Sequence, residues 1–125
     1  MKKMPDKKKT LVLGASDNPS RYSFMAVQRL RNFNHPVVAI GKKLTQVADV
    51  TVEKSKIPYT DIDTVTLYMN PQHQQEYYEY ILTLNPKRII FNPGTENIEL
   101  AKLANKKGIA TIEACTLVML STNQY

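Results

Sequence analysis

The chain has little cysteine and no long apolar segment, and each shortage excludes a class of protein. Its 125 residues include one cysteine, Cys115, so an intramolecular disulfide is impossible, as is usual for proteins of reducing compartments. No apolar run approaches the roughly 18 residues that a membrane-spanning helix needs. The first apolar run, Leu11-Val12-Leu13, is too short for the core of a secretion signal. We therefore expect a cytoplasmic protein that has no membrane partner.

Positive charge is abundant but unevenly distributed. The formal net charge at pH 7 is +6, and five of the 17 basic residues lie in the first nine positions beside a single acid, Asp6. The rest of the chain has 12 basic and 10 acidic residues, so it is nearly neutral. We expect residues 1–9 to form a flexible basic arm. We expect no nucleic-acid partner, because lysines without an aromatic stacking surface are weak evidence for one.

Short apolar runs alternate with helical patterns after the arm. The runs predict strands at residues 10–13, 37–40, 49–53, 64–68, 88–91 and 109–113. Apolar spacings of three and four predict helices at residues 21–33, 71–84 and 96–107, with a short helix at 115–121 and a loop at 55–63. Asn70 suits a helix cap, and Pro71 suits the first helical position, where its missing N–H costs nothing.

The alternation indicates the fold class. Apolar strands separated by helices are typical of a parallel sheet that is covered on both faces. Right-handed crossovers then predict an α/β fold with a doubly wound, mostly parallel sheet of five or six strands, in a single domain over residues 10–125. Ligands of such sheets bind beyond the carboxyl ends of the strands. The segments to inspect are therefore residues 14–20, 41–43, 69–71, 92–97 and 114–116.

The turn after the first strand begins with Gly14, Ala15 and Ser16. Small residues let backbone amides approach an anion, and the N-terminus of the following helix adds a partial positive charge. The full G-x-G-x-x-G pattern of dinucleotide-binding proteins is absent. The turn therefore has two interpretations, phosphate binding or ordinary turn packing.

Two lysines, Lys42 and Lys43, follow the second strand, where NAD-binding enzymes usually place a carboxylate. Lysines in place of that carboxylate disfavour NAD as the ligand. They suit a nucleotide with a phosphate on its ribose, which is the 3′-phosphate of coenzyme A (CoA) or, less favoured, the 2′-phosphate of NADP. The alternative is a pair of solvated lysines in a surface turn.

The later strand ends carry further candidates. Asn92, Pro93, Gly94 and Asn97 offer amide groups and backbone freedom near a ligand, or form an ordinary turn and helix cap. Cys115 begins a short helix and could form a mixed disulfide with a thiol, although a small buried side chain is the more usual role. The two histidines have no partner that would complete a metal site or a catalytic group, so we expect neither.

Several of these motifs together resemble the small stand-alone CoA-binding proteins, which are similar to the N-terminal domain of the succinyl-CoA synthetase α subunit. The motifs are Gly14-Ala15-Ser16, the helix after Tyr22-Ser23, Asn92-Pro93-Gly94-Thr95-Glu96-Asn97, and Ala114-Cys115-Thr116-Leu117-Val118-Met119-Leu120. They occur in this order from about residue 10 to the C-terminus. The resemblance implies a Rossmann-like fold with CoA lying across the strand ends.

The resemblance also implies a role for each candidate residue. The diphosphate would lie on Gly14, Ala15 and Ser16, with Lys42 and Lys43 near the adenosine phosphate. Asn70 and Pro71 would line the adenine or pantetheine side, Asn92, Pro93, Gly94 and Asn97 the pantetheine end, and Cys115 would stand near the thiol. The chain departs from many relatives at Ser23, where they have glycine, and at Gly41-Lys42, where they have Asn-Pro.

The leading hypothesis is that the protein binds CoA or acyl-CoA as a non-catalytic carrier, sensor or redox-related module, with a homodimer as one arrangement open to it. The phosphorylated histidine and partner subunit of the synthetase have no counterpart here, so we expect no ligase activity from this chain. We expect no other enzyme activity, because the sequence contains no complete catalytic constellation. One alternative is a minimal NADP-dependent reductase, which is opposed by the lack of a substrate domain and of a Tyr-x-x-x-Lys pair. The other is a structural subunit whose nucleotide cleft has decayed.

Overall fold

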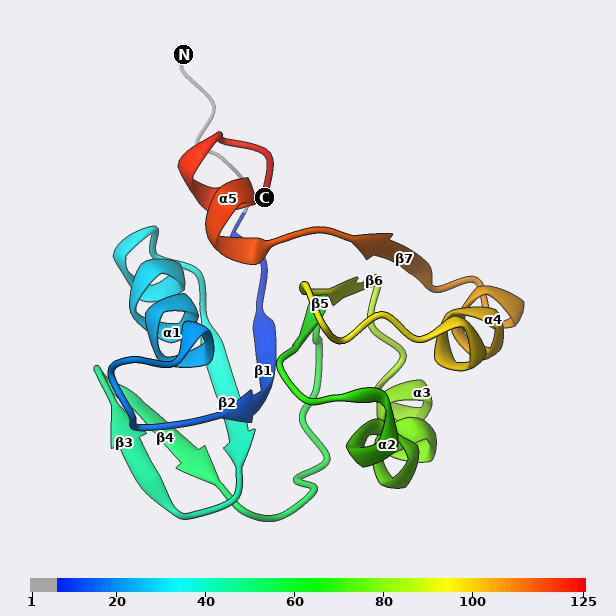
Figure 1. Ribbon diagram of the computed structural model, residues 1–125, viewed down its shortest axis with the longest axis horizontal. Coiled ribbons are helices and arrows are strands. Elements are labelled where there is room, and N and C mark those ends of the chain that lie inside the picture. Colours follow the sequence, from blue (N-terminus) through cyan, green and yellow to red (C-terminus); the bar gives the residue numbers. More distant parts are fainter. Residues whose placement is uncertain (1–6) are drawn as a thin grey trace.

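A twisted seven-stranded sheet lies at the centre of the protein, in the order β3-β4-β2-β1-β5-β6-β7 (Figure 1). The computed structural model describes residues 7–125. The strands are β1 (Thr10–Ala15), β2 (Val37–Gly41), β3 (Thr45–Val47), β4 (Val50–Glu53), β5 (Thr64–Leu67), β6 (Arg88–Phe91) and β7 (Ala110–Glu113). Every neighbouring pair is parallel except β3–β4, which is antiparallel.

Helices cover both faces of this sheet (Figure 1). On one face are α1 (Tyr22–Asn32) and α5 (Thr116–Ser121), and on the other are α2 (Pro71–Gln74), α3 (Tyr78–Leu84) and α4 (Ile98–Lys106). Alternate residues of β1 supply the two cores, because Val12 packs in the cluster with α1 and α5, whereas Leu11 and Leu13 pack in the cluster with α3 and α4. The predicted fold class, a doubly wound, Rossmann-like α/β domain, is confirmed.

The predicted strand count of five or six was too low, because the sequence analysis missed β3. Its three residues are too few to show an alternating pattern, and only Val47 is buried. Ala48, at a positive φ of 54°, turns the chain back into β4. The helix predicted over residues 71–84 is also interrupted by a 3-10 turn, η1 (Gln75–Tyr77). The break follows the buried Gln74, whose side-chain amide donates to the carbonyl oxygens of Met69 and Thr95.

The chain moves along the sheet in one direction after β1 and in the opposite direction after β5. The chain passes from β1 to α1 and then to β2, β3 and β4 on one side, and it returns to β5 on the other side of β1. The point between β1 and β5 is therefore the switch point of the topology, where doubly wound sheets bind ligands. Among residues 7–125, no helix combines the length and the apolar character required to cross a bilayer.

The predicted basic arm falls partly outside the described residues, which begin at Lys7. Lys7, Lys8 and Lys9 each donate an Nζ hydrogen bond to a backbone carbonyl of the domain. The backbone N–H of Lys8 also donates to Nδ1 of His35, at 3.0 Å. These contacts fix the last three arm residues against the amino ends of the strands, while a flexible arm over residues 1–6 stays a prediction.

We expect the protein to lose stability as the pH falls below about 6.5, because of His35. Burial lowers the pKa of this imidazole from 6.5, and the positive charges of Lys7, Lys8 and Arg88 add to the effect. The unfolded chain therefore takes up the proton more readily, so stability that is complete above pH 6.5 is lost as the pH falls through the lower, folded-state pKa. Urea unfolding between pH 7.5 and about 5 measures this slope.

The control is His35→Gln, which keeps an acceptor for the Lys8 N–H but does not titrate. Its free energy of unfolding should change less with pH over this window. The carboxylates of Asp17 and Asp49, whose pKa values lie below 3.8, lose their contribution only in more acidic solution. An unchanged slope in His35→Gln would show that the pH dependence has another source.

Candidate functional site

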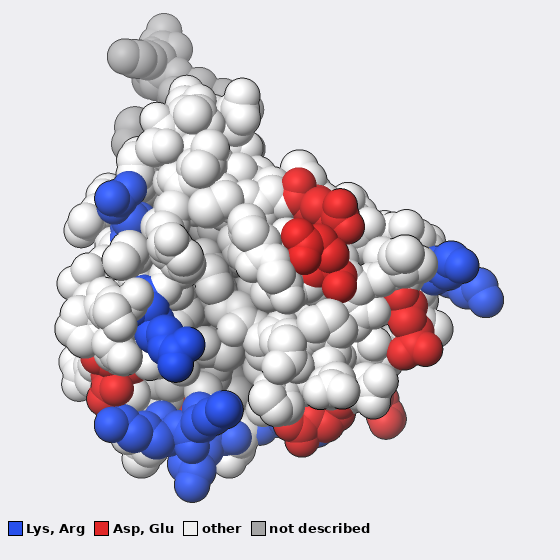
Figure 2. Space-filling model, viewed as in Figure 1, with Lys and Arg blue, Asp and Glu red and all other residues white. Residues whose placement is uncertain are grey.

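A cleft of about 730 Å³ opens beyond the carboxyl ends of the strands, at the switch point. It is lined by residues that follow β1, β2, β4, β5 and β6, together with the starts of α1 and α2. Figure 2 shows this face of the molecule hollowed between its two halves. The volume lies within the range of roughly 300–1,000 Å³ that is usual for small-molecule sites.

Two glycines let the strands approach one another at the base of the cleft. Gly14 has a φ of 96°, and a Cβ there would lie 2.9 Å from the carbonyl carbon and oxygen of Tyr68. A Cβ on Gly41 would lie 2.2 Å from the carbonyl oxygen of Ala15. Both distances are too short for any other residue, so the packing of β1 against β2 and β5 itself requires glycine.

The N-terminus of α1 faces the cleft without a side-chain cap. Its N-cap residue, Arg21, makes no capping hydrogen bond, and the first turn contains no acid. Arg21, Tyr22 and Ser23 all line the cleft. The first N–H groups of a helix have no acceptor within the helix and attract anions. Together with the turn at Gly14, Ala15 and Ser16, this helix end can bind a phosphate.

One wall of the cleft is basic, with Arg21, Lys42, Lys43 and Lys54 along it. Figure 2 shows basic side chains gathered below the hollow, over the ends of β2 and β4. Lys43 is partly neutralised, because its Nζ lies 3.0 Å from a carboxylate oxygen of Asp17. That hydrogen bond, together with one from Thr45, holds the pKa of Asp17 below its ordinary value. Among residues 7–125, Lys42 and Lys54 form no ion pair.

The opposite wall comes from the ends of β5 and β6 and from α2 and η1. Met69, His73, Tyr77, Pro93 and Thr95 line it, together with one acid, Glu76. Tyr68 also lines the cleft, but its hydroxyl is buried and makes no hydrogen bond among the described residues. Burial raises the pKa of this hydroxyl well above its ordinary value. This wall is less charged than the basic one and suits an uncharged, partly apolar part of a ligand.

Six of the predicted site residues lie outside the lining, and four of them are Asn70, Pro71, Gly94 and Cys115. Asn70 caps α2, since its Oδ1 accepts the N–H of His73 at 3.0 Å, and Pro71 takes the first helical position as predicted. Gly94 has a φ of 91°, and its N–H donates to Oε1 of Glu96. Cys115 is half-buried at the start of α5. None of these four residues contributes to the lining of the cleft.

Asn92 and Asn97 also lie outside the lining, because other parts of the protein occupy their amide groups. Asn92 is 2% exposed, and its Nδ2 donates to Oγ1 of Thr66 and to the carbonyl of Leu67. Its Oδ1 accepts the N–H of Thr116. The Oδ1 of Asn97 accepts from the N–H of Leu100 at the start of α4, and its Nδ2 donates to Gln74 and Tyr78. Both amides hold elements together.

The structure therefore brings about half of the predicted residues into one cleft: Gly14, Ala15, Ser16, Lys42, Lys43 and Pro93. The sequence analysis missed Arg21 and Lys54 as parts of its basic wall. Lys54 directly follows β4, as Lys42 follows β2, so applying the strand-end rule to the third predicted strand would have found it. His73 and Tyr77 had no such signal, because they lie on a helix whose orientation the sequence does not specify.

Comparisons with known proteins identify the family. A family model described as a CoA binding domain matches residues 8–121. An uncharacterized protein of known crystal structure is 45% identical, with a TM-score of 0.94 over 97% of this chain and 100% of that chain. A hypothetical protein from Pyrococcus horikoshii OT3 is 25% identical, with a TM-score of 0.83 over 93% of this chain and 83% of that one.

A third structure, cell-free ID.343 from Thermus thermophilus, is 21% identical with a TM-score of 0.80, covers 95% of this chain and 91% of that chain, and supports the fold alone. No curated protein matches the chain. The family match spans nearly all of the described residues and includes every strand that borders the cleft. The chain therefore belongs to the family of CoA binding domains.

Proposed function

We propose that this protein binds coenzyme A, free or acylated, in the cleft at the switch point. The observation that carries the proposal is the presence of two anion-binding features in one cleft: an uncapped helix N-terminus beside the Gly14 turn, and a separate basic wall. CoA carries a diphosphate and a 3′-phosphate, joined to a long uncharged pantetheine arm. Membership of the family of CoA binding domains supports the same ligand.

The proposed arrangement places each phosphate against its own feature. The diphosphate lies over Gly14, Ala15 and Ser16 and meets the first N–H groups of α1. The 3′-phosphate lies against Lys42 and Lys54, whose side chains have no ion-pair partner among the described residues, while Lys43 contributes less because of Asp17. Tyr22, which lines the cleft and is 69% exposed, offers a ring on which the adenine can stack.

The pantetheine arm would follow the less charged wall past Met69, Tyr77 and Pro93. Asn70, Pro71, Gly94 and Asn97 then lie behind this wall and position it. Asn92 holds the wall from within the core. Cys115 remains the residue proposed to lie nearest to the thiol. Attack of its thiolate on CoA disulfide would form a mixed disulfide and release one CoA thiol, and the product would appear as an added CoA in the intact mass, removed by reductant.

The proposed role is that of a carrier, sensor or redox-related module in the cytoplasm. Membership of the family of CoA binding domains supports the ligand on which this role rests. The minimal NADP-dependent reductase remains the second candidate, because the basic wall would also suit a 2′-phosphate.

Titration calorimetry with CoA, NADPH and ATP, together with thermal melting, tests the proposal. We expect CoA to bind most tightly and to raise the melting temperature, because saturation at about 100 times the dissociation constant adds about 2.7 kcal/mol to the stability. Stabilisation by NADPH but not by CoA would favour the reductase. If no nucleotide shifts the melting temperature, the cleft is a decayed one and the protein is a structural subunit.

A further inference from the structure

The edge of the sheet formed by β7 is open. This strand lies at one end of the strand order, and three of its four residues, Ala110, Ile112 and Glu113, are exposed. The other edge strand, β3, is folded back against β4, and its Val47 is 1% exposed. An exposed edge strand presents N–H and C=O groups that can pair with another strand.

The register of β6 and β7 shows which backbone groups face outward. The N–H of Ala110 donates to the carbonyl of Lys87, and the N–H of Ala114 donates to the carbonyl of Phe91, so even-numbered residues bond to β6. Backbone groups alternate in direction along a strand. The N–H and C=O of Thr111 and Glu113 therefore face away from β6, and they are the groups that an added strand would bind.

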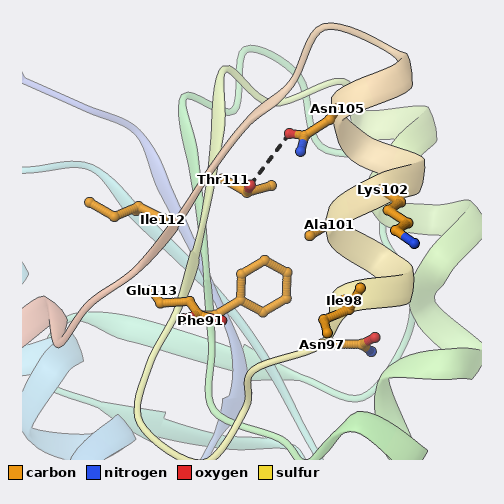
Figure 3. Close-up of a pocket in the computed structure, with 9 residues that line it drawn as sticks. All are labelled: Phe91, Asn97, Ile98, Ala101, Lys102, Asn105, Thr111, Ile112 and Glu113. Atoms are coloured by element: carbon orange, nitrogen blue, oxygen red, sulfur yellow. Dashed lines mark hydrogen bonds between the residues drawn. The ribbon is translucent and has the colours of Figure 1, made fainter.

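Apolar surface borders this edge on both faces of the sheet. Figure 3 shows a groove between α4 and β7, into which the ring of Phe91 and the side chain of Ile98 point, while Ile112 points away from α4. The groove has a volume of about 210 Å³. Ile98 is 73% exposed, Ile112 42%, and Val118 on α5 55%. Apolar side chains of this size at an open edge favour a protein partner.

Charges of opposite sign lie at the two ends of the same surface. Because α4 and β7 are joined by a tight turn and run in opposite directions, the start of α4 lies beside the end of β7 (Figure 3). That end carries the acids Glu96, Glu99 and Glu113, and the turn end carries Lys106 and Lys107. Figure 2 shows the acidic atoms gathered near the end of β7 and basic atoms at the far end of α4.

We propose that two copies of this chain pair through β7, antiparallel about a two-fold axis, to form one continuous sheet. A two-fold axis across the edge places the acidic end of each copy against the basic end of the other, so the surface is complementary to itself in charge as well as in hydrogen bonding. A surface that carried one sign of charge along its whole length would be repelled by its own copy.

The outward-facing backbone groups of Thr111 and Glu113 determine the register in which two β7 strands pair. With the axis at Ile112, Thr111 exchanges both backbone hydrogen bonds with Glu113 of the partner subunit, and the two Ile112 side chains lie opposite each other. An axis at Glu113 would set the two carboxylates opposite each other, which is unfavourable. With the axis at Thr111, only the two copies of Thr111 would exchange backbone hydrogen bonds between the two β7 strands. The register centred on Ile112 therefore makes the most bonds and buries an apolar pair.

Sedimentation of the full chain over a range of concentrations tests the dimer. We expect a dimer for the wild type and a monomer for Ile112→Lys, which sets two ammonium groups opposite each other. Thr111→Pro should also be monomeric, and it removes no bond to β6 because the N–H of Thr111 faces outward. Far-UV circular dichroism and urea unfolding, which depend on the fold and not on a ligand, show that each variant is folded. Leu44→Lys, exposed at the far side of the sheet, is the matched control and should stay dimeric.

Disulfide cross-linking tests the register in a Cys115→Ser background. The Cα atoms of residues opposite each other at a non-hydrogen-bonded position are about 4.5 Å apart, within the range that a disulfide spans. Ile112→Cys should therefore cross-link under mild oxidation. Thr111→Cys should not, because its two copies would lie more than about 7 Å apart.

A wild-type monomer at every concentration would overturn the proposal and leave the edge to another partner. A dimer that persists in both Ile112→Lys and Thr111→Pro would place the interface elsewhere. The cleft residues take no part in this surface, so either result is independent of whether CoA binds.

Discussion

Replacing Lys42 and Lys54 together by glutamate is expected to weaken CoA binding about 100-fold and dephospho-CoA binding about tenfold. Both lysines line the cleft, and neither forms an ion pair among the described residues, so both charges are free to act on a ligand. Dephospho-CoA lacks the 3′-phosphate and keeps the diphosphate. The double substitution therefore removes from dephospho-CoA only the longer-range attraction of its diphosphate to the basic wall, which salt screens over about 10 Å.

Calorimetric titration of both ligands at one ionic strength measures the two losses. The matched control is Arg29→Glu with Lys87→Glu, which makes the same change in net charge at exposed positions outside the cleft. The control separates a local contact with the phosphate from the general effect of a more acidic protein. Equal losses for CoA and dephospho-CoA in the Lys42/Lys54 variant would remove the proposed 3′-phosphate contact.

The same two lysines show how far the sequence specified the site. Lys42 was predicted because a clear apolar run ends directly before it, and the carboxyl ends of parallel strands meet at one edge of the sheet. Lys54 follows β4, a half-exposed strand whose pattern is weaker because it pairs with the hairpin strand β3. The sequence therefore predicted the fold class and the edge of the sheet at which the cleft lies, but only part of the basic wall.

The roles of polar residues in turns were harder to predict from the sequence. A turn sequence such as Asn92-Pro93-Gly94 allows an amide to face either a ligand or the core, and composition does not distinguish them. The deciding groups here come from distant segments, since Thr66 and Thr116 converge on Asn92 only after β5, β6 and α5 have packed. Pro93 does line the cleft, one residue further along. Adjacent residues thus have different roles, which only the three-dimensional structure separates.

Replacing Asn92 by alanine should lower the free energy of unfolding by about 3 kcal/mol. The substitution leaves three buried groups without their partner: the Thr66 hydroxyl, the Leu67 carbonyl and the Thr116 N–H. Each unpaired buried group costs about 1–3 kcal/mol, and the two threonine side chains can compensate in part through their own hydrogen bond at 2.8 Å. Urea unfolding measures the loss.

Asn70→Ala provides the comparison, because it removes an amide of the same kind from an exposed helix cap and should cost only about 1 kcal/mol. The folded fraction of Asn92→Ala should bind CoA with nearly wild-type affinity, since the amide belongs to the core that joins β5, β6 and α5. A variant with near-normal stability and strongly weakened CoA binding would give the opposite assignment, in which Asn92 contacts the pantetheine arm. Comparing the loss of stability with the loss of CoA affinity therefore decides whether Asn92 holds the wall of the cleft or the ligand within it.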